Sequence, residues 1–378
     1  MIYLDNAATT KVTPEVADAM KPYLFDNYAN PSAQYSIARQ ARLAIEKARK
    51  QVADAINAEP NQIFFTSGAT ESNNIVMRAF DHTICSNIEH PSIKGIEFDF
   101  FEGIKDDHKG TFKLNTNKWR DSLQELITVL TTEKPKEKTI LSCQYVNNET
   151  GQILPVKNMC DLAHKNHIPF HTDATQAFGH LTIDVKFLDC DFLSLSGHKF
   201  HAPKGVGILY IKEPDKFKSS VIGGGQEKGV RSGTENVAGI VGIGRAAELF
   251  KHDYFEHRYV NVLYNYLIDL LRQMFPFKHR LIRYEALYEY IPNIVNIAIE
   301  GIEGESLLLL LDNRDIFLSG GSACHSGQNS KSKVLQAMGE SDTAEMGTIR
   351  VSMDVTNNKH DIFEFVKTLS EVVKAIAR

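Results

Sequence analysis

The chain has 378 residues, of which 43% are hydrophobic, and its formal net charge is −5 at pH 7. This length and hydrophobic content predict two or three domains with a large core, and the weakly negative charge excludes a global basic field that would favour nucleic acid or acidic membranes. No run of about eighteen apolar residues occurs and the opening MIYLDNAATT lacks the pattern of a secretory signal, so we expect neither a membrane span nor secretion.

Predicted helices and strands alternate over the first two thirds of the chain. Apolar residues recur at helical spacing from Ile37 to Ile56 and predict an amphipathic helix. The stretch QIFFTSGATESNN predicts a strand that ends at Thr66-Ser67-Gly68 and leads into a helix. TILSCQYV, IPFHTDA, CDFLSLS and GVGILYI predict short buried strands, with a helix from Val156 to His167 between the first two. This alternation predicts an α/β domain with a largely parallel sheet.

The pattern becomes mainly helical after about residue 230. Two strand-like runs, IPNIVNIAI and MGTIRVSM, interrupt it, and an amphipathic helix is expected from His360 to Arg378. We therefore predict a large α/β domain over residues 15–250, with a mostly parallel, helix-flanked sheet. A smaller α+β domain would combine residues 1–14 with residues 251–378.

Two strand ends carry candidate ligand groups. In TSGATESNN, free backbone N–H groups and a hydroxyl at the start of a helix suit a phosphate, although an ordinary turn with Thr70 as N-cap uses the same residues. In HTDATQAFG, Asp173 follows a buried run, where an unpaired carboxylate is costly. Asp173 is therefore either a helix N-cap or a carboxylate that keeps a heterocyclic nitrogen protonated.

The stretch LSLSGHKFHAPKG places Lys199 at the end of a predicted buried strand, where a lysine is unusual. A lysine beside a phosphate site and a buried carboxylate favours pyridoxal phosphate, because the amine can bind the cofactor aldehyde as an imine while the carboxylate pairs with the pyridinium nitrogen. Ser196 and Lys199 also fit the S-x-x-K motif of β-lactamase-like enzymes. Those enzymes need S-D-N and K-T-G strings as well, and neither occurs here.

The five cysteines are scattered and form no CxxC pair, which argues against a disulfide framework or a cysteine zinc site and favours a cytoplasmic location. One of them, Cys324, lies in LSGGSACHSGQNS, whose small polar residues predict an exposed loop. The adjacent His325 would favour its thiolate, although a Cys-His pair also arises by chance.

His164, His167 and His171 are spaced by three and four residues, a spacing that could suggest a metal site. His167, however, ends a predicted helix and His171 begins a predicted strand end, so the three rings need not converge. No carboxylate motif completes the set, and we predict no metal.

Taken together, FTSGATESNN, EHPSI, VNNETG, HTDATQAFG, SLSGHKF, GGGQEKGVRSGTENVAGIVGIG and GGSACHSG resemble the motifs of cysteine desulfurases of the NifS/IscS type. These are class V aminotransferase-like, fold-type I pyridoxal phosphate enzymes. The resemblance runs from YLDNAATTKVTPEV to TIRVSM, nearly the whole chain. It implies a homodimer that converts L-cysteine to L-alanine. The sulfur would remain as an enzyme-bound persulfide for iron–sulfur cluster assembly or thiolation, with an acceptor protein such as an iron–sulfur scaffold.

The resemblance also implies which residues react. Lys199 would bind the cofactor aldehyde, and His90 would stack on the pyridine ring and assist proton transfer. Cys324 would attack the substrate sulfur and carry it as the persulfide. Arg350 would bind the substrate carboxylate bidentately, with Asn148 beside both substrate and cofactor.

A second set would hold the cofactor. Asp173 would pair with the ring nitrogen, and Gln176 would contact the ring hydroxyl. The other contacts, mainly to the phosphate, would come from Ala69, Thr70, Ser196 and His198, and from Thr234 of the other subunit.

Some stretches depart from the family pattern. The glycine–serine run is followed by Cys-His-Ser-Gly, where IscS-type enzymes commonly have Cys-Thr-Ser-Ala, and the region from residue 98 to 117 matches poorly. RVSM stands where a sequence like RFSLG is frequent. Because a Cys-His-Ser string also resembles selenocysteine lyases, that activity on the same scaffold remains an alternative. A non-enzymatic sulfur-relay scaffold is disfavoured, because it would not need Lys199, Asp173 and His90.

Overall fold

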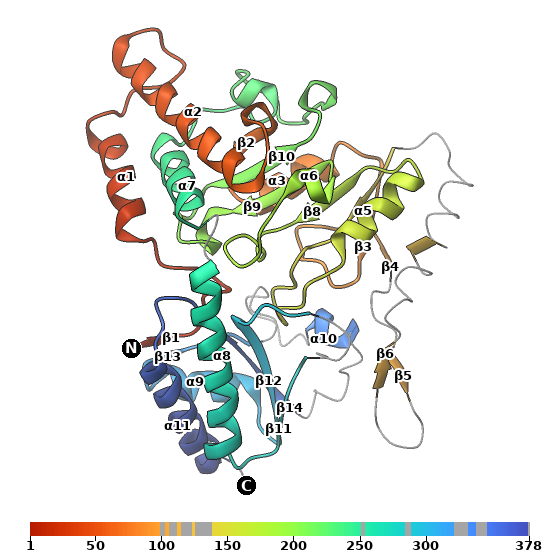
Figure 1. The fold of residues 1–378 in the computed structure, drawn as a ribbon, viewed down its shortest axis with the longest axis vertical. Helices are drawn as coiled ribbons and strands as arrows, with labels where there is room; N and C mark the ends of the chain where they lie inside the picture. Colours follow the sequence, from red (N-terminus) through yellow and green to blue (C-terminus); the bar gives the residue numbers. More distant parts are fainter. Residues whose placement is uncertain are drawn as a thin grey trace.

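The structure is a computed structural model, and it describes residues 1–98, 103–105, 112–114, 123–124, 138–250, 254–283, 289–320, 332–337 and 346–376. Figure 1 shows two sheets, the larger in the upper half of the view and the smaller in the lower half. In the part of the chain covered by these ranges, no helix is both long and apolar enough to cross a membrane.

The larger sheet has seven strands in the order β2-β10-β9-β8-β7-β3-β4. All its neighbouring strands pair in parallel except β10, which is antiparallel to both β9 and β2. The predicted mostly parallel sheet is thus confirmed. In sheet order the strands are β2 (Ile63–Thr66), β10 (Gly207–Ile211), β9 (Phe192–Ser196), β8 (Phe170–Asp173), β7 (Thr139–Ser142), β3 (His82–Ser86) and β4 (Ile96–Phe98).

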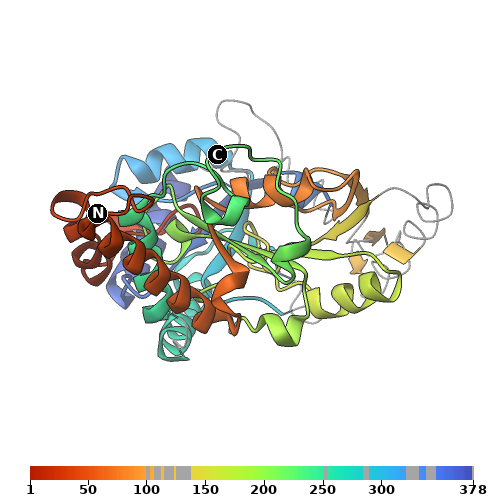
Figure 2. The same ribbon diagram turned by 90° about the horizontal axis from the view of Figure 1, so that it is seen from above.

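Helices cover both faces of this sheet (Figure 2). Alternate residues of β2 pack on opposite faces of the sheet. Phe64 packs with residues of α3, whereas Ile63 and Phe65 belong to a separate hydrophobic cluster with residues of α2, α5 and α7. This two-sided burial explains why the strands are continuously apolar. The helices are α1 (Pro14–Phe25), α2 (Ser36–Ile56), α3 (Ala69–Met77), α5 (Val156–Lys165), α6 (Val185–Leu188) and α7 (Val237–Phe250).

The predicted amphipathic helix is α2, whose buried stripe faces α7. The two helices touch at glycine: a Cβ on Gly244 would lie 2.6 Å from the Cα of Ala48, so only glycine permits this approach. Ile37 was expected in the buried stripe but is 41% exposed, because it lies in the first turn of the helix, away from this contact.

The smaller sheet is antiparallel, in the order β11-β12-β14, and α8, α9 and α11 contribute to its hydrophobic core. Its strands β12 and β14 and the helix α11 correspond to the predicted runs IPNIVNIAI and MGTIRVSM and the terminal helix. The domain boundaries themselves remain a prediction. In chain order after α7, and apart from β13 given below, the helices and strands are α8 (Tyr254–Met274), β11 (His279–Leu281), β12 (Ile294–Glu300), α9 (Gly304–Asp312), α10 (Lys333–Ala337), β14 (Met346–Ser352) and α11 (Lys359–Ile376).

Two further pairings involve short strands. A hairpin is formed by β5 (Gly103–Lys105) and β6 (Phe112–Leu114), within the region that fits the family pattern poorly. Near the N-terminus, β1 (Ile2–Tyr3) pairs in parallel with β13 (Ile316–Phe317).

The stretch after β1 connects the two sheets. The backbone N–H of Asn6 donates to the carbonyl of Ser352 at the end of β14, and the N–H of Thr10 donates to the carbonyl of His198 just beyond β9. Residues 5–10 therefore run from the edge of the smaller sheet to the strand ends of the larger one, and they form one wall of the cavity described next.

Candidate active site

A cavity of about 630 Å³ lies where several strands of the larger sheet end. Ligands of open α/β sheets bind at the carboxyl ends of the strands, so this is the expected place for a site. The predicted site residues that line it are Ala69, Thr70, His90, Asn148, Asp173, Gln176, Ser196, His198, Lys199 and Arg350.

Two predicted residues do not join this group. Thr234 is exposed and does not line the cavity within its own chain. Cys324 and its neighbour His325 lie outside the described residues.

Lys199 ends the short 3-10 turn Gly197–Lys199 that follows β9, and its amine is held by the N-terminal stretch. Its Nζ donates to the backbone carbonyls of Ala7, at 2.6 Å, and Ala8, at 2.9 Å. These two contacts fix the amine at the cavity wall. These contacts could not be predicted from the sequence, because a carbonyl acceptor carries no side-chain signature.

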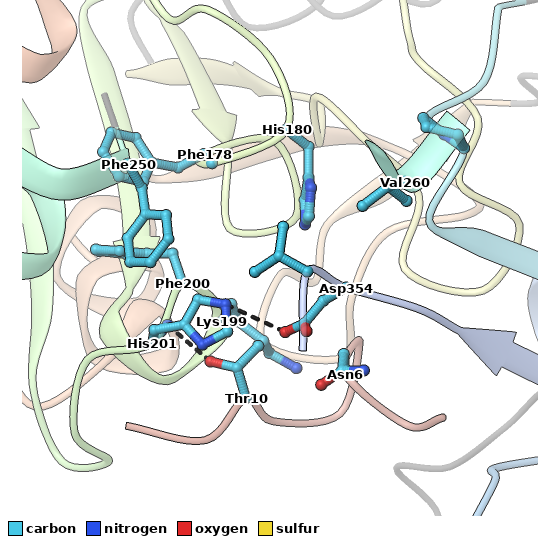
Figure 3. A pocket seen from close by; sticks show the side chains of 13 residues that line it. Asn6, Thr10, Phe178, His180, Lys199, Phe200, His201, Phe250, Val260 and Asp354 are labelled. Atoms are coloured by element: carbon cyan, nitrogen blue, oxygen red, sulfur yellow. Dashed lines mark hydrogen bonds and ion pairs between the residues drawn. The ribbon is translucent and has the colours of Figure 1, made fainter. Parts of the chain in front are cut away.

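The opposite side of Lys199 is closed by packing. Figure 3 shows the second, much smaller space there, which measures about 20 Å³ and is lined by aromatic rings. The His201 ring stacks on Phe250 at 4.8 Å between centroids, and its Nε2 lies 3.1 Å from Oδ2 of Asp354, beyond β14. A space of this size holds about one water molecule, so this space beside Lys199 is too small to bind a substrate.

Asp173 is buried at the end of β8. Its Oδ2 accepts a hydrogen bond of 2.8 Å from Nδ2 of Asn73, and its Oδ1 accepts one of 3.0 Å from the N–H of Thr175. No helix begins here, so the helix N-cap alternative is wrong. Among the described residues, Asp173 forms no ion pair within 4 Å. A buried carboxylate so placed suits a cationic group in the cavity.

The other end of the cavity suits an anion. Helix α3 begins at Ala69 with Gly68 as N-cap and no side-chain cap, so its first-turn N–H groups are available to a ligand. Thr70 lies inside this turn, and the alternative that it is the N-cap is therefore wrong. A Cβ on Gly207 would lie 2.5 Å from the Cα of Gly68, so the turn depends on glycine in β10.

His198 adds a neutral donor to this end. Burial, together with the positive charges of Lys199 and Lys204, lowers its pKa to about 4. Its Nδ1 lies 3.2 Å from the hydroxyl of Thr9. A neutral imidazole beside two lysines can contribute a hydrogen bond while the lysines supply the charge that a phosphate needs.

Arg350 lies on β14 and is buried. Its Nη2 donates to Oδ1 of Asp5 at 2.9 Å, and its Nη1 donates to the carbonyl of Asn148 at 3.0 Å. Its Nε is buried and has no partner among the described residues, which leaves a guanidinium donor for a carboxylate ligand. Asp5 was missed from the sequence, although YLDNAATT was part of the resemblance.

We expect Arg350→Lys to raise the KM for cysteine by roughly ten- to a hundredfold, because an ammonium cannot bond Asp5 and Asn148 and at the same time present a donor to a carboxylate as the planar guanidinium can. The visible spectrum of the loaded protein should stay unchanged. Steady-state kinetics test this, with Arg314→Lys as the control, since Arg314 forms an exposed ion pair with Glu371. An unchanged KM would remove Arg350 from the site.

Two acidic residues near the site were also missed. Burial raises the pKa of the Glu149 carboxyl to about 7, although a hydrogen bond from Ser332 and the charge of Arg350 act in the opposite direction. Burial likewise raises the pKa of Glu89 to about 8, while its hydrogen bonds from Ser86 and the N–H of Gln144 oppose the shift. Glu89 as a residue is half-buried, but its carboxyl oxygens point inward onto these two donors.

The shift of Glu89 predicts a pH dependence. Its folded pKa lies above the ordinary 4.5, so the folded state retains a proton that the unfolded chain releases, and stability falls as the pH rises from about 4.5 to 8. Glu89→Gln should remove this loss. Between pH 5 and 8, the free energy of unfolding of Glu89→Gln should rise relative to that of the wild type by on the order of 3 kcal/mol.

Urea unfolding at pH 5, 6.5 and 8 measures this difference. The control is Glu213→Gln, which removes an exposed carboxylate paired with Lys216. A difference between wild type and Glu89→Gln that does not change with pH would show that Glu89 is ionised in the folded state throughout.

His164 and His171, two of the three closely spaced histidines, have different partners in the structure and do not converge. His164 bonds Asp191 at 2.8 Å, whereas His171 is buried between the hydroxyls of Ser142 and Ser194. No group of three or more potential metal ligands occurs within the described residues.

Comparison with known proteins places this geometry in a family. The sequence profile of the aminotransferase class-V family matches residues 2–365. This chain belongs to that family. Its relatives confirm that it resembles cysteine desulfurases of the NifS/IscS type in both sequence and fold.

The chain is similar to the cysteine desulfurase IscS of Methanosarcina thermophila, at 39% identity over 99% of this chain and 92% of the relative. Among solved structures it is similar to a NifS-like protein from Rickettsia africae, with a TM-score of 0.84, 29% identity and 99% coverage of both chains. It is also similar to SspA in complex with cysteine, with a TM-score of 0.73, 30% identity and coverage of 94% of this chain and 99% of the other.

Proposed function

We propose that this chain is a pyridoxal 5'-phosphate-dependent cysteine desulfurase that converts L-cysteine to L-alanine and collects the sulfur on Cys324 as a persulfide. One observation carries the proposal: the amine of Lys199, the buried carboxylate of Asp173 and the guanidinium of Arg350 line one cavity. The similarity to a cysteine desulfurase over nearly the full length of both chains, and to a protein solved with cysteine, supports it.

The donor set of the cavity fits the cofactor. Lys199 would bind the aldehyde, and Asp173 would keep the ring nitrogen protonated. The start of α3, with Ala69 and Thr70, and the strand-end residues Ser196 and His198 would hold the phosphate. Gln176 would contact the ring hydroxyl, and its amide nitrogen lies 2.9 Å from the carbonyl of Ala7. When bound, the protonated cofactor withdraws electrons from Cα of the substrate and so weakens the bond to sulfur.

The side chains around the substrate would each have a separate role. Arg350 would bind the cysteine carboxylate through its free donor, and Asn148 lies beside it. The thiolate of Cys324 would attack the substrate sulfur. A new S–S bond forms, the C–S bond breaks with its electron pair moving toward the substrate carbon, and protonation of that carbon gives alanine.

The assembly and location are also part of this proposal. Each site in a homodimer would receive Thr234 from the other subunit, and the exposure of Thr234 in a single chain is compatible with that role. A cytoplasmic location is supported by the buried cysteines Cys143, Cys160 and Cys190, which form no disulfide within the described residues. The sulfur would pass to an acceptor protein, such as an iron–sulfur scaffold.

One assay tests the activity. The purified, cofactor-loaded protein is incubated with cysteine and a thiol reductant, and alanine and sulfide are measured together. Equal amounts of both, above a cofactor-only blank, are expected. If cysteine is bound without turnover while selenocysteine is converted rapidly, the selenocysteine lyase alternative, suggested by the Cys-His-Ser string, replaces this proposal.

A further inference from the structure

A continuous line of hydrogen bonds joins Asp173 to His90. Asn73 lies on α3 and is fully buried, and its Nδ2 is 2.8 Å from Oδ2 of Asp173 and 2.8 Å from Oγ of Ser92. The same Ser92 Oγ is 2.8 Å from Nδ1 of His90. Two intervening residues, neither predicted from the sequence, thus connect the carboxylate and the imidazole of the candidate site.

The direction of these hydrogen bonds follows from what each group can do. A carboxylate accepts, so the amide nitrogen of Asn73, and not its oxygen, must face Asp173. That nitrogen has two hydrogens, and the second points to Ser92 Oγ. The hydroxyl therefore accepts from Asn73 and keeps its own hydrogen to donate to Nδ1 of His90.

A second donor reaches the same nitrogen. The backbone N–H of Ser92 lies 3.1 Å from Nδ1 of His90 and, being an amide N–H, can only donate. A ring nitrogen that receives two donors must present its lone pair. In neutral His90 the hydrogen is consequently on Nε2.

We propose that Asn73 and Ser92 are positioning residues that fix neutral His90 as the Nε2–H tautomer. His90 then donates a hydrogen bond into the cavity from Nε2 and cannot accept a proton there. The tautomer stands on the hydrogen bonds alone, and only its catalytic consequence rests on the proposed function. In that reaction, His90 stabilises a negatively polarised atom, and any proton that leaves the substrate must be accepted by another group, such as the amine of Lys199.

The electrostatic surroundings favour the neutral form of the His90 ring, and it is the tautomer of this neutral form that Asn73 and Ser92 would fix. Burial lowers the pKa of His90, and the charge of Lys199 lowers it too, whereas the charge of Asp173 raises it. The first and largest of these effects is burial. At neutral pH the imidazole is therefore uncharged, and its tautomer decides whether it donates or accepts.

The experiment is side-chain NMR of the full chain in its cofactor-free form, with ¹⁵N-labelled histidine. His90→Gln identifies the His90 signals by their loss. In the wild type we expect the shift of a protonated nitrogen at Nε2 and of an unprotonated nitrogen at Nδ1. A wild-type protein with its hydrogen on Nδ1 overturns the proposal without any variant.

Asn73→Asp tests the role of the amide. The introduced carboxyl would lie against Asp173, so the two acids would share a proton, and its other oxygen is an acceptor where Asn73 had a donor. The Ser92 hydroxyl should turn toward this oxygen, and Oγ should accept from Nδ1 of His90. We expect the hydrogen to move to Nδ1 and the His90 pKa to rise by about one unit. Asn74→Asp is the control, because it makes the same substitution on the same helix, where the amide of Asn74 bonds the carbonyl of Thr70 and not Ser92.

Ser92 gives an independent pair of variants. Ser92→Ala should allow the Nδ1–H form to appear beside the Nε2–H form, since only the backbone donor remains. Ser92→Thr keeps the hydroxyl and should restore the wild-type tautomer. If Asn73→Asp and Ser92→Ala both leave the tautomer and the pKa as in the wild type, these residues do not position His90.

These measurements need neither cofactor nor turnover. An Nε2–H signal in a protein that forms no alanine from cysteine would leave the inference standing and overturn the proposed function. An Nδ1–H signal in an active desulfurase would do the reverse.

Discussion

We expect Lys199→Ala to lower the rate of alanine production from cysteine by at least about a thousandfold, and to remove the yellow colour expected of the cofactor-loaded protein. The amine is the group that would bind the cofactor aldehyde, and the carbonyls of Ala7 and Ala8 hold it at the cavity wall. No other lysine is held by these carbonyls among the described residues. The rate of alanine formation and the visible absorbance spectrum measure the two effects.

Lys212→Ala is the matched control. Lys212 follows β10 and pairs with Asp189 at 2.6 Å, away from the cavity, so the same change there should leave colour and rate within twofold of the wild type. Thermal unfolding of the cofactor-free forms separates loss of chemistry from loss of fold. A yellow, fully active Lys199→Ala protein would contradict the assignment of Lys199.

We expect Cys324→Ser to abolish alanine formation from cysteine and to leave the yellow colour of the cofactor-loaded protein intact. Sulfur on the substrate side chain leaves poorly unless a nucleophile takes it, and a serine hydroxyl at neutral pH is far weaker than a thiolate. Selenium leaves more readily, so turnover of selenocysteine should fall only in part. In the wild type, mass spectrometry of the peptide under non-reducing conditions should find one additional sulfur on Cys324 after treatment with cysteine.

Cys160→Ala controls for the loss of a cysteine elsewhere, since Cys160 is buried on α5. It should retain alanine formation. Wild-type rates of alanine formation from cysteine in Cys324→Ser would refute the persulfide mechanism and leave the cofactor assignment unaffected.

The helices and strands of the larger sheet were predictable because their apolar patterns are local. The helix from Ser36 to Ile56 and the strands that end at Thr66, Asp173 and Ser196 lie where the pattern placed them. The reversed direction of β10 was not predicted. The connection from β9 to β10 consists only of residues 197–206, which is too short for the crossover that a parallel neighbour needs. The length of this connection could therefore have predicted the antiparallel pairing.

The candidate site was predictable for side chains within long motifs and not for their partners. Asp5 and Arg350 are 345 residues apart, and nothing in either segment alone indicates the ion pair. Asn73 and Ser92 lie inside quoted motifs, yet their contribution depends on the packing of α3 against the end of β8. Such contacts arise from the tertiary fold and have no periodic signature.

The N-terminal wall of the cavity has a consequence for how the protein is made. Its residues hold Lys199 through two carbonyls and Arg350 through one carboxylate, but these partners are synthesised much later. On a ribosome, this stretch emerges before β9 and β14, so it must wait for both strands before all its contacts can form. A nascent chain therefore lacks the full set of these contacts until β14 has been synthesised. The proposed binding of a substrate carboxylate by Arg350 would accordingly become available only after β14 has been translated.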